Sequence, residues 1–325
     1  MARAELKDQV NANRDAVSLL TPGTKFPERL SDFFVWCGDV EAFLDKLPIS
    51  PIFDLVVTSP PYNIGKDYEA PLELEAYRVW QARVIEKIVC RLKDTGSVCW
   101  QVGNHLLQGK GADRGSIYPL DYLFHPIFEK NGLTLRNRIV WRFGHGLHCK
   151  HRFSGRYETV LWYTLSNRYK FFLDRVRIPS KYPGKRHYKG PNQGKYSSNP
   201  RGKNPEDVWD FPDDVWAIPN VKSRHIEKTE HPCQFPVGLV QRLLLAFTDE
   251  GDLVFDPFAG AGSTGVAAAA TMRHFWGCEI VPEYARIATE RINSALAGGQ
   301  NFRPHDKPIY DHTQSKLSHN PFREL

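Results

Sequence analysis

The order of apolar runs along the chain restricts the fold more than any other feature of this sequence. Short runs without polar alternation, at residues 33–39, 53–59 and 96–103, are typical of strands buried on both faces. Segments with apolar residues at three- and four-residue steps, such as residues 73–92, indicate helices between them. Strands that alternate with helices predict a doubly wound, mostly parallel α/β sheet with its sites at the C-terminal ends of the strands.

Two further patterns complete the expected architecture. The runs at 133–143 and 159–165 are close in sequence and predict an antiparallel edge of the sheet. Periodicity is lost between residues 166 and 230, and the 325-residue length allows one large domain or a domain with a major insertion. We expect five parts: an N-terminal arm (1–30), a catalytic half-domain (31–165), an inserted irregular recognition region (166–230), a cofactor-binding half-domain (231–298) and a tail (299–325).

Positive charge is concentrated in one part of the chain. Residues 170–203 hold ten Lys or Arg and a single acid, Asp174, although the whole chain has a formal net charge of only +6. A confined basic segment is the electrostatic signature of a polyanion partner such as nucleic acid, whereas the alternative is a solvated, partly disordered loop. The candidates for phosphate and base-edge contacts are Arg175, Arg177, Lys185, Arg186 and Lys189.

Other features restrict location and metal chemistry. No apolar run approaches the roughly 20 residues of a membrane helix, the six cysteines form no CxxC pair, and no leader-like segment begins the chain. We therefore expect a cytoplasmic protein without a membrane partner. The cluster at residues 145–151 (HGLHCKH) has metal-binding residue types, but its spacing matches no familiar zinc pattern and three cations (Arg142, Lys150, Arg152) surround it, so we expect no metal.

The stretch VFDPFAGAGST, residues 254–264, predicts a nucleoside-binding turn after a strand. Gly260 and Gly262 allow a tight turn and close approach of a ligand, and Glu279 lies 23 residues after Asp256, as suits a carboxylate that accepts both ribose hydroxyls. The pattern is neither GxGxxG nor GxxxxGK[ST], so dinucleotides and nucleoside triphosphates lack their usual site. Asp256 would suit a positive group, which favours S-adenosylmethionine, an adenosine with a sulfonium.

The stretch TSPPYN, residues 58–63, ends another strand with two prolines and an aromatic ring. Two fixed φ angles and two missing amide donors make Ser59, Pro60 and Pro61 a rigid hydrogen-bond acceptor for an exocyclic amino group. Tyr62 offers a flat face for a base taken out of its stack. Hydrogen bonds to both amine protons would free the nitrogen lone pair for methyl transfer, although an ordinary Pro-Pro turn explains these residues equally well.

TSPPYN together with DPFAGAGST resembles the amino-methyltransferases of DNA, which methylate cytosine N4 or adenine N6 with S-adenosylmethionine. The order of the two motifs, with a basic segment between them, is similar to the β-arranged subgroup, whose target recognition domain falls in that gap. CGD at 37–39, RYETVLWY at 156–163 and residues 228–244 also resemble segments of that subgroup. The resemblance covers most of residues 33–296.

Carried over by position, the resemblance implies the following roles. Catalytic residues would be Ser59, Pro60, Pro61 and Tyr62. Cofactor-binding residues would be Asp39, Thr58, His231, Gln234, Phe235, Pro236, Asp256, Pro257, Phe258, Gly260, Gly262, Ser263 and Glu279. The substrate would be double-stranded DNA, with a cognate restriction endonuclease as a possible functional partner and a homodimer as a possible assembly.

The resemblance leaves alternatives open. Many adenine-N6 enzymes have Asp where this chain has Ser59, so we favour cytosine N4 and keep adenine N6 as the alternative. Methylation of RNA or of a protein amide is a second alternative, and the basic segment favours nucleic acid over protein. A DNA-binding regulator that has lost catalysis is a third, although both motifs are intact.

Overall fold

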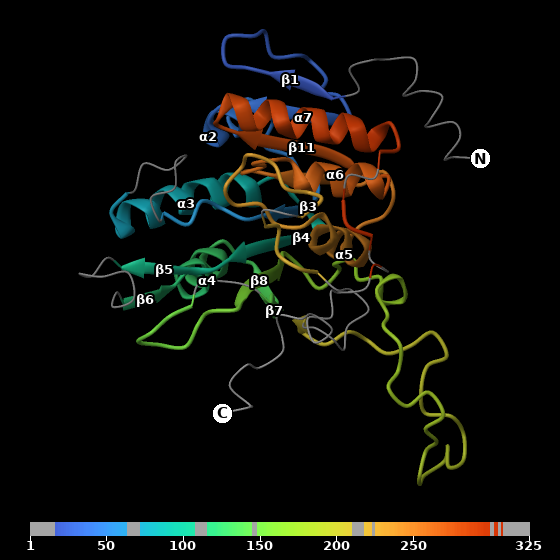
Figure 1. The fold of residues 1–325 in the computed structure, drawn as a ribbon. Coiled ribbons are helices and arrows are strands. Elements are labelled where there is room, and N and C mark those ends of the chain that lie inside the picture. The colour runs from blue at the N-terminus through green and yellow to red at the C-terminus, as the bar shows by residue number, and fades with distance from the viewer. Residues whose placement is uncertain are drawn as a thin grey trace.

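The computed structural model describes residues 17–63, 72–107, 116–144, 148–209, 218–222, 225–299, 302–304 and 307 (Figure 1). A nine-stranded sheet forms its centre, and the predicted doubly wound fold with an antiparallel edge is confirmed. In spatial order its strands are β1 (Ser18–Leu20), β2 (Phe33–Cys37), β11 (His274–Glu279), β10 (Leu253–Asp256), β3 (Phe53–Thr58), β4 (Leu92–Val102), β8 (Tyr157–Thr164), β7 (Thr134–Arg142) and β9 (Val208–Trp209). Only the pairs β4–β8 and β8–β7 are antiparallel within this sheet.

Helices cover both faces of the sheet because neighbouring strand residues point to opposite sides. On β2, Phe33, Val35 and Cys37 join one apolar core, whereas Phe34 and Trp36 join the other. The first core is completed by α5 (Val237–Phe247), α6 (Ser263–Ala270) and α7 (Pro282–Leu296). The second is completed by α2 (Val40–Leu44), α3 (Leu74–Val89) and α4 (Leu120–Lys130). None of the helices in these described parts is both long and apolar enough to span a membrane.

Four short strands escaped the sequence analysis. β1 has only three residues and lies in the segment expected to be an irregular arm. β5 (Asn104–Leu107) and β6 (Ser116–Pro119) form a separate two-stranded sheet, and β9 has two residues. Such short strands carry too little alternation to be recognised, because their place depends on a neighbouring strand rather than on their own side chains.

The topology brings the two sequence motifs together. β3 and β10 are parallel neighbours, with Leu55 opposite Val254 and Val56 opposite Phe255. The TSPPYN segment follows β3 directly, and the glycine-rich turn follows β10. Parallel strands end at the same edge of a sheet, so both motifs lie side by side at that edge.

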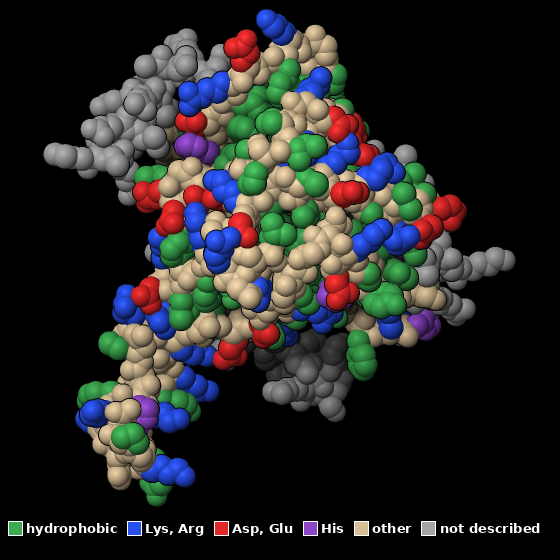
Figure 2. Space-filling view, turned by 180° about the vertical axis from the view of Figure 1, so that it is seen from behind, with side chains coloured by type: hydrophobic (Ala, Val, Ile, Leu, Met, Phe, Trp, Pro, Cys, Tyr) green, Lys and Arg blue, Asp and Glu red, His purple; other side chains and the backbone are tan. Residues whose placement is uncertain are grey.

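A basic arm, which we define as residues 179–202, stands away from the body of the molecule (Figures 1 and 2). It contains six Lys or Arg and no Asp or Glu. An antiparallel bridge between Ile178 and Lys203 closes its base. Gly202 is required there, because its φ is +98° and a Cβ would meet the Ile178 carbonyl oxygen at 2.2 Å.

The chain is held to the body on both sides of the arm. After the arm, β9 pairs with β7, and Trp209 is buried with its ring 4.2 Å from the Arg242 guanidinium. Before the arm, the Phe172 amide donates to the Ala246 carbonyl oxygen at 2.7 Å. The arm therefore projects from two fixed points. Trp216, the second tryptophan of the predicted recognition region, lies outside the described residues.

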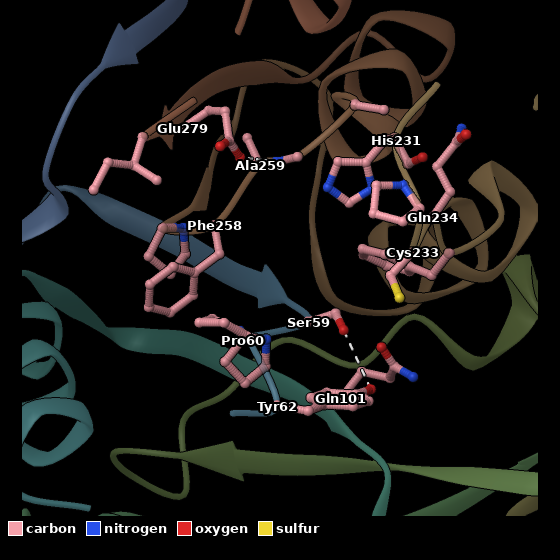
Figure 3. Close-up of a pocket in the computed structure, with 18 of the residues that line it drawn as sticks. Ser59, Pro60, Tyr62, Gln101, His231, Cys233, Gln234, Phe258, Ala259 and Glu279 are labelled. Carbon is pink, nitrogen blue, oxygen red and sulfur yellow. Dashed lines mark hydrogen bonds between the residues drawn. The ribbon is translucent and has the colours of Figure 1, made fainter. Parts of the chain in front are cut away.

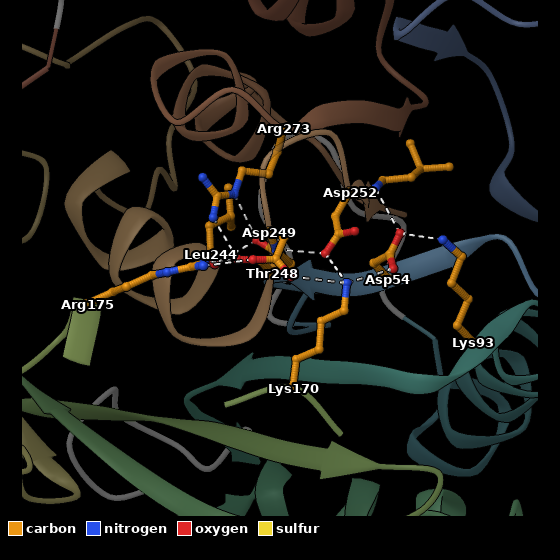
Figure 4. A network of polar contacts seen from close by, with 10 residues as sticks. Asp54, Lys93, Lys170, Arg175, Leu244, Thr248, Asp249, Asp252 and Arg273 are labelled. Carbon is orange, nitrogen blue, oxygen red and sulfur yellow. Dashed lines mark hydrogen bonds and ion pairs between the residues drawn. The ribbon is translucent and has the colours of Figure 1, made fainter. Parts of the chain in front are cut away.

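A polar network holds the segment before the arm at the end of the sheet opposite the two motifs (Figure 4). Lys170 Nζ lies 2.5 Å from Asp252 Oδ2 and 3.5 Å from Asp54 Oδ1. Asp54 is buried, and it also pairs with Lys93 and accepts a hydrogen bond from the Leu253 amide. Lys170 thus joins the segment before the arm to Asp54 in β3 and to Asp252, which directly precedes β10.

We expect Lys170→Met to lower the free energy of unfolding by about 2 kcal/mol, because it leaves Asp252 and the buried Asp54 with one cation fewer. Denaturant unfolding of purified protein measures this. The matched control is Lys93→Met, which removes the other, more exposed cation and should cost less. An unfolding midpoint for Lys170→Met equal to that of the native chain would contradict this role.

Candidate active site

A cavity of about 950 Å³ opens where β3 and β10 end (Figure 3). Its wall combines residues 59–63, the turn after β10, residues 231–235 and the end of β2. Tyr62 and Gly260 both line it, although they come from opposite halves of the sequence. The two motifs therefore share one enclosed space, large enough for a nucleoside-sized ligand together with a base.

The acceptor segment of residues 59–62 is held from behind by α3. Tyr77 on α3 donates its hydroxyl proton to the Pro61 carbonyl oxygen at 2.7 Å. The Pro61 carbonyl, one of the acceptors expected from the sequence, is thus already bonded within the protein. Within the described parts of the chain, the Pro60 carbonyl accepts no hydrogen bond, and Pro60 lines the cavity. Of the two proline carbonyls, only that of Pro60 is therefore free of a protein donor in the described residues.

The chain after the two prolines is braced as well. Asn63 has a φ of +57°, and its side-chain amide forms two hydrogen bonds of 2.7 Å with the backbone of Leu72. Asn is among the few residues that tolerate this left-handed conformation. His105 Nδ1 forms a hydrogen bond of 3.2 Å with the Tyr62 carbonyl oxygen. These contacts hold the backbone of Tyr62 and Asn63 against neighbouring segments.

Tyr62 remains a neutral phenol in this setting. Burial and the neighbouring Glu158 raise its pKa well above the usual value, and the hydrogen bond from Ser59 opposes the rise. Ser59 Oγ donates to Tyr62 Oη at 3.3 Å, as Figure 3 shows. The uncharged ring can therefore serve as a stacking surface beside the Pro60 carbonyl.

Asp256 has a different position from the one expected. Its carboxylate is fully buried and accepts hydrogen bonds from Thr58 Oγ1 (2.6 Å), Thr264 Oγ1 (2.6 Å) and the Phe258 amide (3.0 Å). Burial raises its pKa to about 6, against the effect of these donors. The carboxylate that the sequence analysis offered to a positive ligand is thus enclosed by the protein, and it does not line the cavity.

Glu279 ends the next strand, β11, and lines the cavity. Its carboxylate accepts from the amides of Gly260 and Val281, both at 2.8 Å. Burial raises its pKa, and these backbone donors oppose the rise. One carboxylate therefore shapes the glycine turn and still faces the cavity.

The two glycines of the turn are needed for different reasons. Gly260 has a φ of +51°, and a Cβ there would lie 3.1 Å from His231 Nε2. Gly262 has a φ of +75°, and a Cβ there would lie 2.8 Å from Ala288 Cα on α7. Gly260 thus keeps space beside the cavity, whereas Gly262 lets α6 pack closely on α7.

Burial lowers the pKa of His231 to about 4, so its imidazole is neutral near pH 7.

The structure brings most of the expected cofactor residues to one wall. Those that line the cavity are Asp39, His231, Gln234, Phe235, Pro257, Phe258, Gly260, Ser263 and Glu279. Those outside its lining are Thr58, Pro236, Asp256 and Gly262. Thr58 and Asp256 join β3 to β10 instead, Pro236 precedes α5 as its N-cap residue, and Gly262 is a helix-packing position.

The sequence analysis missed several lining residues as members of the site. They come from α3, β4, β7, the position directly after β7, and β8: Tyr77, Trp80, Gln101, Trp141, Phe143 and Glu158. Glu158 belongs to the RYETVLWY stretch, which was identified only as a resemblance, without a role for its acid. The other residues look like ordinary core positions, because their helical or strand spacing carries no chemical signal.

The expected DNA contacts separate into two groups. Arg175 bonds to the Thr248 carbonyl and Asp249, and Arg177 bonds to Asp174 and the Gly202 carbonyl. Arg175 therefore holds the segment before the arm against the body, and Arg177 joins the two sides of the arm's base to each other. The remaining candidates, Lys185, Arg186 and Lys189, lie exposed on the arm itself.

Metal ligands are not assembled in the described residues, which contain no group of three or more His, Cys, Asp or Glu side chains placed to hold an ion. Of the HGLHCKH cluster, residues 145–147 lie outside the described parts, and His148 and His151 are exposed. The cluster therefore adds no metal site to the described structure.

Comparison with known proteins agrees with this geometry. Two curated relatives are similar over most of the chain. The Type II methyltransferase M.BglII of Bacillus subtilis is 44% identical over 82% of this chain and 71% of its own length. The Type II methyltransferase M.ScaI of Streptomyces caespitosus is 35% identical over 81% of this chain and 82% of its own length.

Solved structures show the same arrangement. A DNA modification methylase from Thermus thermophilus, in complex with S-adenosyl-L-methionine, matches 81% of this chain and 94% of its own with a TM-score of 0.56 and 27% identity. The cytosine-N4-specific PvuII DNA methyltransferase matches with a TM-score of 0.61 over 82% of this chain and 93% of its own. At 22% identity, that second likeness shows the fold alone.

The family described as DNA methylase, of the N6 and N4 type, matches residues 53–290, which include both motifs, the basic arm and the whole junction between β3 and β10. Together with the relatives above 30% identity, this match shows that the chain belongs to the N6/N4 DNA methylase family.

Proposed function

We propose that this protein transfers a methyl group from S-adenosylmethionine to an exocyclic amino group of a base flipped out of duplex DNA. The observation that carries the proposal is the shared cavity, which Pro60 and Tyr62 line on one side and the glycine turn after β10 lines on the other. A methyl donor on one wall and an amine on the other would then be close enough to react.

The residues present fit the cofactor. Gly260 leaves free the space that a Cβ would take beside His231, and Glu279 presents a carboxylate suited to ribose hydroxyls. Asp39 and Phe258 line the same region. Bound there, the cofactor supplies an electrophilic methyl group on a sulfonium. The relative from Thermus thermophilus described above was solved with this cofactor, which supports the assignment.

The protein contributes orientation and electrostatics. The Pro60 carbonyl would accept one proton of the amino group, and Ser59 Oγ, which also faces the cavity, would accept the other. Both interactions pull the nitrogen toward tetrahedral geometry and free its lone pair. Tyr62 would stack on the ring and hold it in line with the methyl group.

We favour cytosine N4 as the methylated atom, because Ser59 stands where many adenine-N6 enzymes have Asp. DNA from cells that express the protein, digested to nucleosides and analysed by mass spectrometry, should contain 4-methylcytosine. Finding 6-methyladenine instead would move the assignment to adenine N6. Finding neither, beside an expressed and folded protein, would favour an RNA or protein substrate or a regulator without catalysis.

The acceptor segment can be tested by two tyrosine changes. Tyr62→Ala should reduce methyl transfer by about tenfold or more, because the base loses its stacking surface, whereas cofactor binding measured by calorimetry stays near that of the native chain. Tyr77→Phe keeps its ring but loses the hydrogen bond to Pro61, so a smaller loss of rate is expected.

Tyr163→Phe is the matched control for these variants. It removes a hydroxyl that bonds to His125, away from the cavity lining, and should leave methyl transfer unchanged. Full activity of Tyr62→Ala would argue against the proposed base site.

We further propose that the basic arm binds the DNA backbone. Its cations have no acidic neighbours within the arm, and Tyr182, Tyr188 and Tyr196 are 67%, 90% and 63% exposed beside them. Exposed aromatic rings among cations suit stacking and phosphate contacts together. Arg186 lies 4.0 Å from the Tyr196 ring, which holds its guanidinium in a fixed orientation.

Replacing Lys185, Arg186 and Lys189 together by Gln should weaken DNA binding and reduce the slope of log K against log salt by about two to three. Fluorescence anisotropy at several salt concentrations measures both effects. The control removes the same charge elsewhere, by changing Lys25, Arg29 and Lys130 to Gln, and should leave the slope near its native value. If the arm variant bound DNA with unchanged affinity, the arm would instead be the solvated loop that the sequence analysis gave as the alternative.

Further expectations from the sequence extend this proposal. A cognate restriction endonuclease is supported by the names of the relatives, which are called Type II methyltransferases. A homodimer and a cytoplasmic location stay predictions. The division of the chain at residues 166 and 230 also stays a prediction, since the ends of that region pack on the body.

A further inference from the structure

One group of polar side chains in the cavity has no part in the reaction described so far. Gln101 on β4 and Glu158 on β8 both line the cavity, on the side of Tyr62. Gln101 Nε2 donates a hydrogen bond to Glu158 Oε2. Gln101 is 2% exposed, and its Oε1 has no hydrogen-bond partner among the described residues. A buried, unpaired acceptor in a cavity wall points to a polar ligand group.

Glu158 lies against the edge of the base-stacking ring. A Cβ built on Gly103 would lie 3.1 Å from Tyr62 Cε2 and 3.4 Å from Glu158 Oε1, so both atoms border the space that this glycine leaves open. Figure 3 shows Gln101 beside Tyr62 as well. A base stacked on Tyr62 would therefore present one of its edges to this carboxyl and this amide.

We propose that Glu158, held by Gln101, donates a hydrogen bond to the ring nitrogen next to the reacting amino group. This inference rests on the proposed function. That nitrogen is N3 of cytosine or N1 of adenine, and it is an acceptor in both bases. The corresponding nitrogen of thymine or guanine carries a hydrogen, which a donating carboxyl would repel. Glu158 would thus select the two bases that bear an amino group at this position.

The protonation state of Glu158 suits this role. Burial raises its pKa to about 7, and the hydrogen bond from Gln101 opposes the rise. The carboxyl is neutral below that pH and can donate, and it loses its proton as the pH rises through about 7. Tyr62 is the titratable side chain at its edge, with His105 behind it. The other titratable or charged residues of the cavity are Asp39, Tyr77, Arg83, Lys222, Lys228, His231, Cys233 and Glu279.

A substrate analogue tests the contact directly. Once the methylated base is mapped, a duplex can be made in which its ring nitrogen is replaced by C–H, as in 3-deazacytosine or 1-deazaadenine. The native protein should lose about tenfold or more in kcat/KM on this duplex. Glu158→Ala should lose a similar factor on the natural duplex and show no further loss on the analogue. A full additional loss in Glu158→Ala would overturn the proposal.

The Glu158→Gln variant distinguishes a hydrogen-bond donor from a base at this position, because the amide of the new Gln side chain donates at every pH. It should recover part of the rate lost in Glu158→Ala, keep its sensitivity to the analogue and show no fall in rate above pH 7, where the native protein falls. If Glu158 acted instead as a base that removes the amine proton, Glu158→Gln would be as inactive as Glu158→Ala and the native rate would rise with pH.

Failure of this inference can be told apart from failure of the proposed function. The native protein with labelled cofactor and the natural duplex tests methyl transfer alone. If the methyl group is transferred but the native protein methylates the analogue duplex as well as the natural one, the proposed role of Glu158 is wrong and the proposed function is retained. If no methyl group is transferred to DNA although the cofactor binds, the proposed function is wrong, and so is the inference about Glu158.

Discussion

A single buried hydrogen bond, from Thr58 Oγ1 to Asp256 Oδ1, joins the two halves of the site across 198 residues of sequence. It links the last residue of β3 to the last residue of β10, and Thr264 and the Phe258 amide donate to the same carboxylate. A buried carboxylate is costly unless several donors satisfy it. The junction therefore fixes the acceptor segment of residues 59–62 relative to the glycine turn, and the cavity depends on it.

Contacts with the sheet also determine where the basic arm leaves the body of the molecule. A long exposed segment without a core could take many directions, but here both of its ends are pinned to the sheet. Lys170 connects its start to Asp54 and Asp252, and the buried Trp209 holds its end. Most residues between these points are exposed. The exposed cations of the arm thus project from fixed attachments on both sides.

Sequence patterns predicted the fold and the meeting of the two motifs, because strand and helix periods and strand-end motifs are local signals. They could not predict the orientation of Asp256, since the residue types in a motif do not show whether a carboxylate faces a ligand or the protein interior. They could not find Tyr77 or Glu158, whose roles come from elements packed beside the motifs. Arg175 looked like a phosphate contact because composition shows charge but not its partners.

Charge is divided between the cavity and the arm in a way that suits base flipping. Within the cavity, His231 and Tyr62 are neutral near pH 7, because burial disfavours their charged forms. A neutral base that stacks beside these two side chains does not have to desolvate a charge on either of them. The cations of the arm lie outside the cavity, and among them only Arg201 forms an ion pair within the described residues, with Asp174. In the proposed reaction, contacts to the DNA backbone would offset the cost of unstacking, and the cavity would then only have to recognise and orient the base.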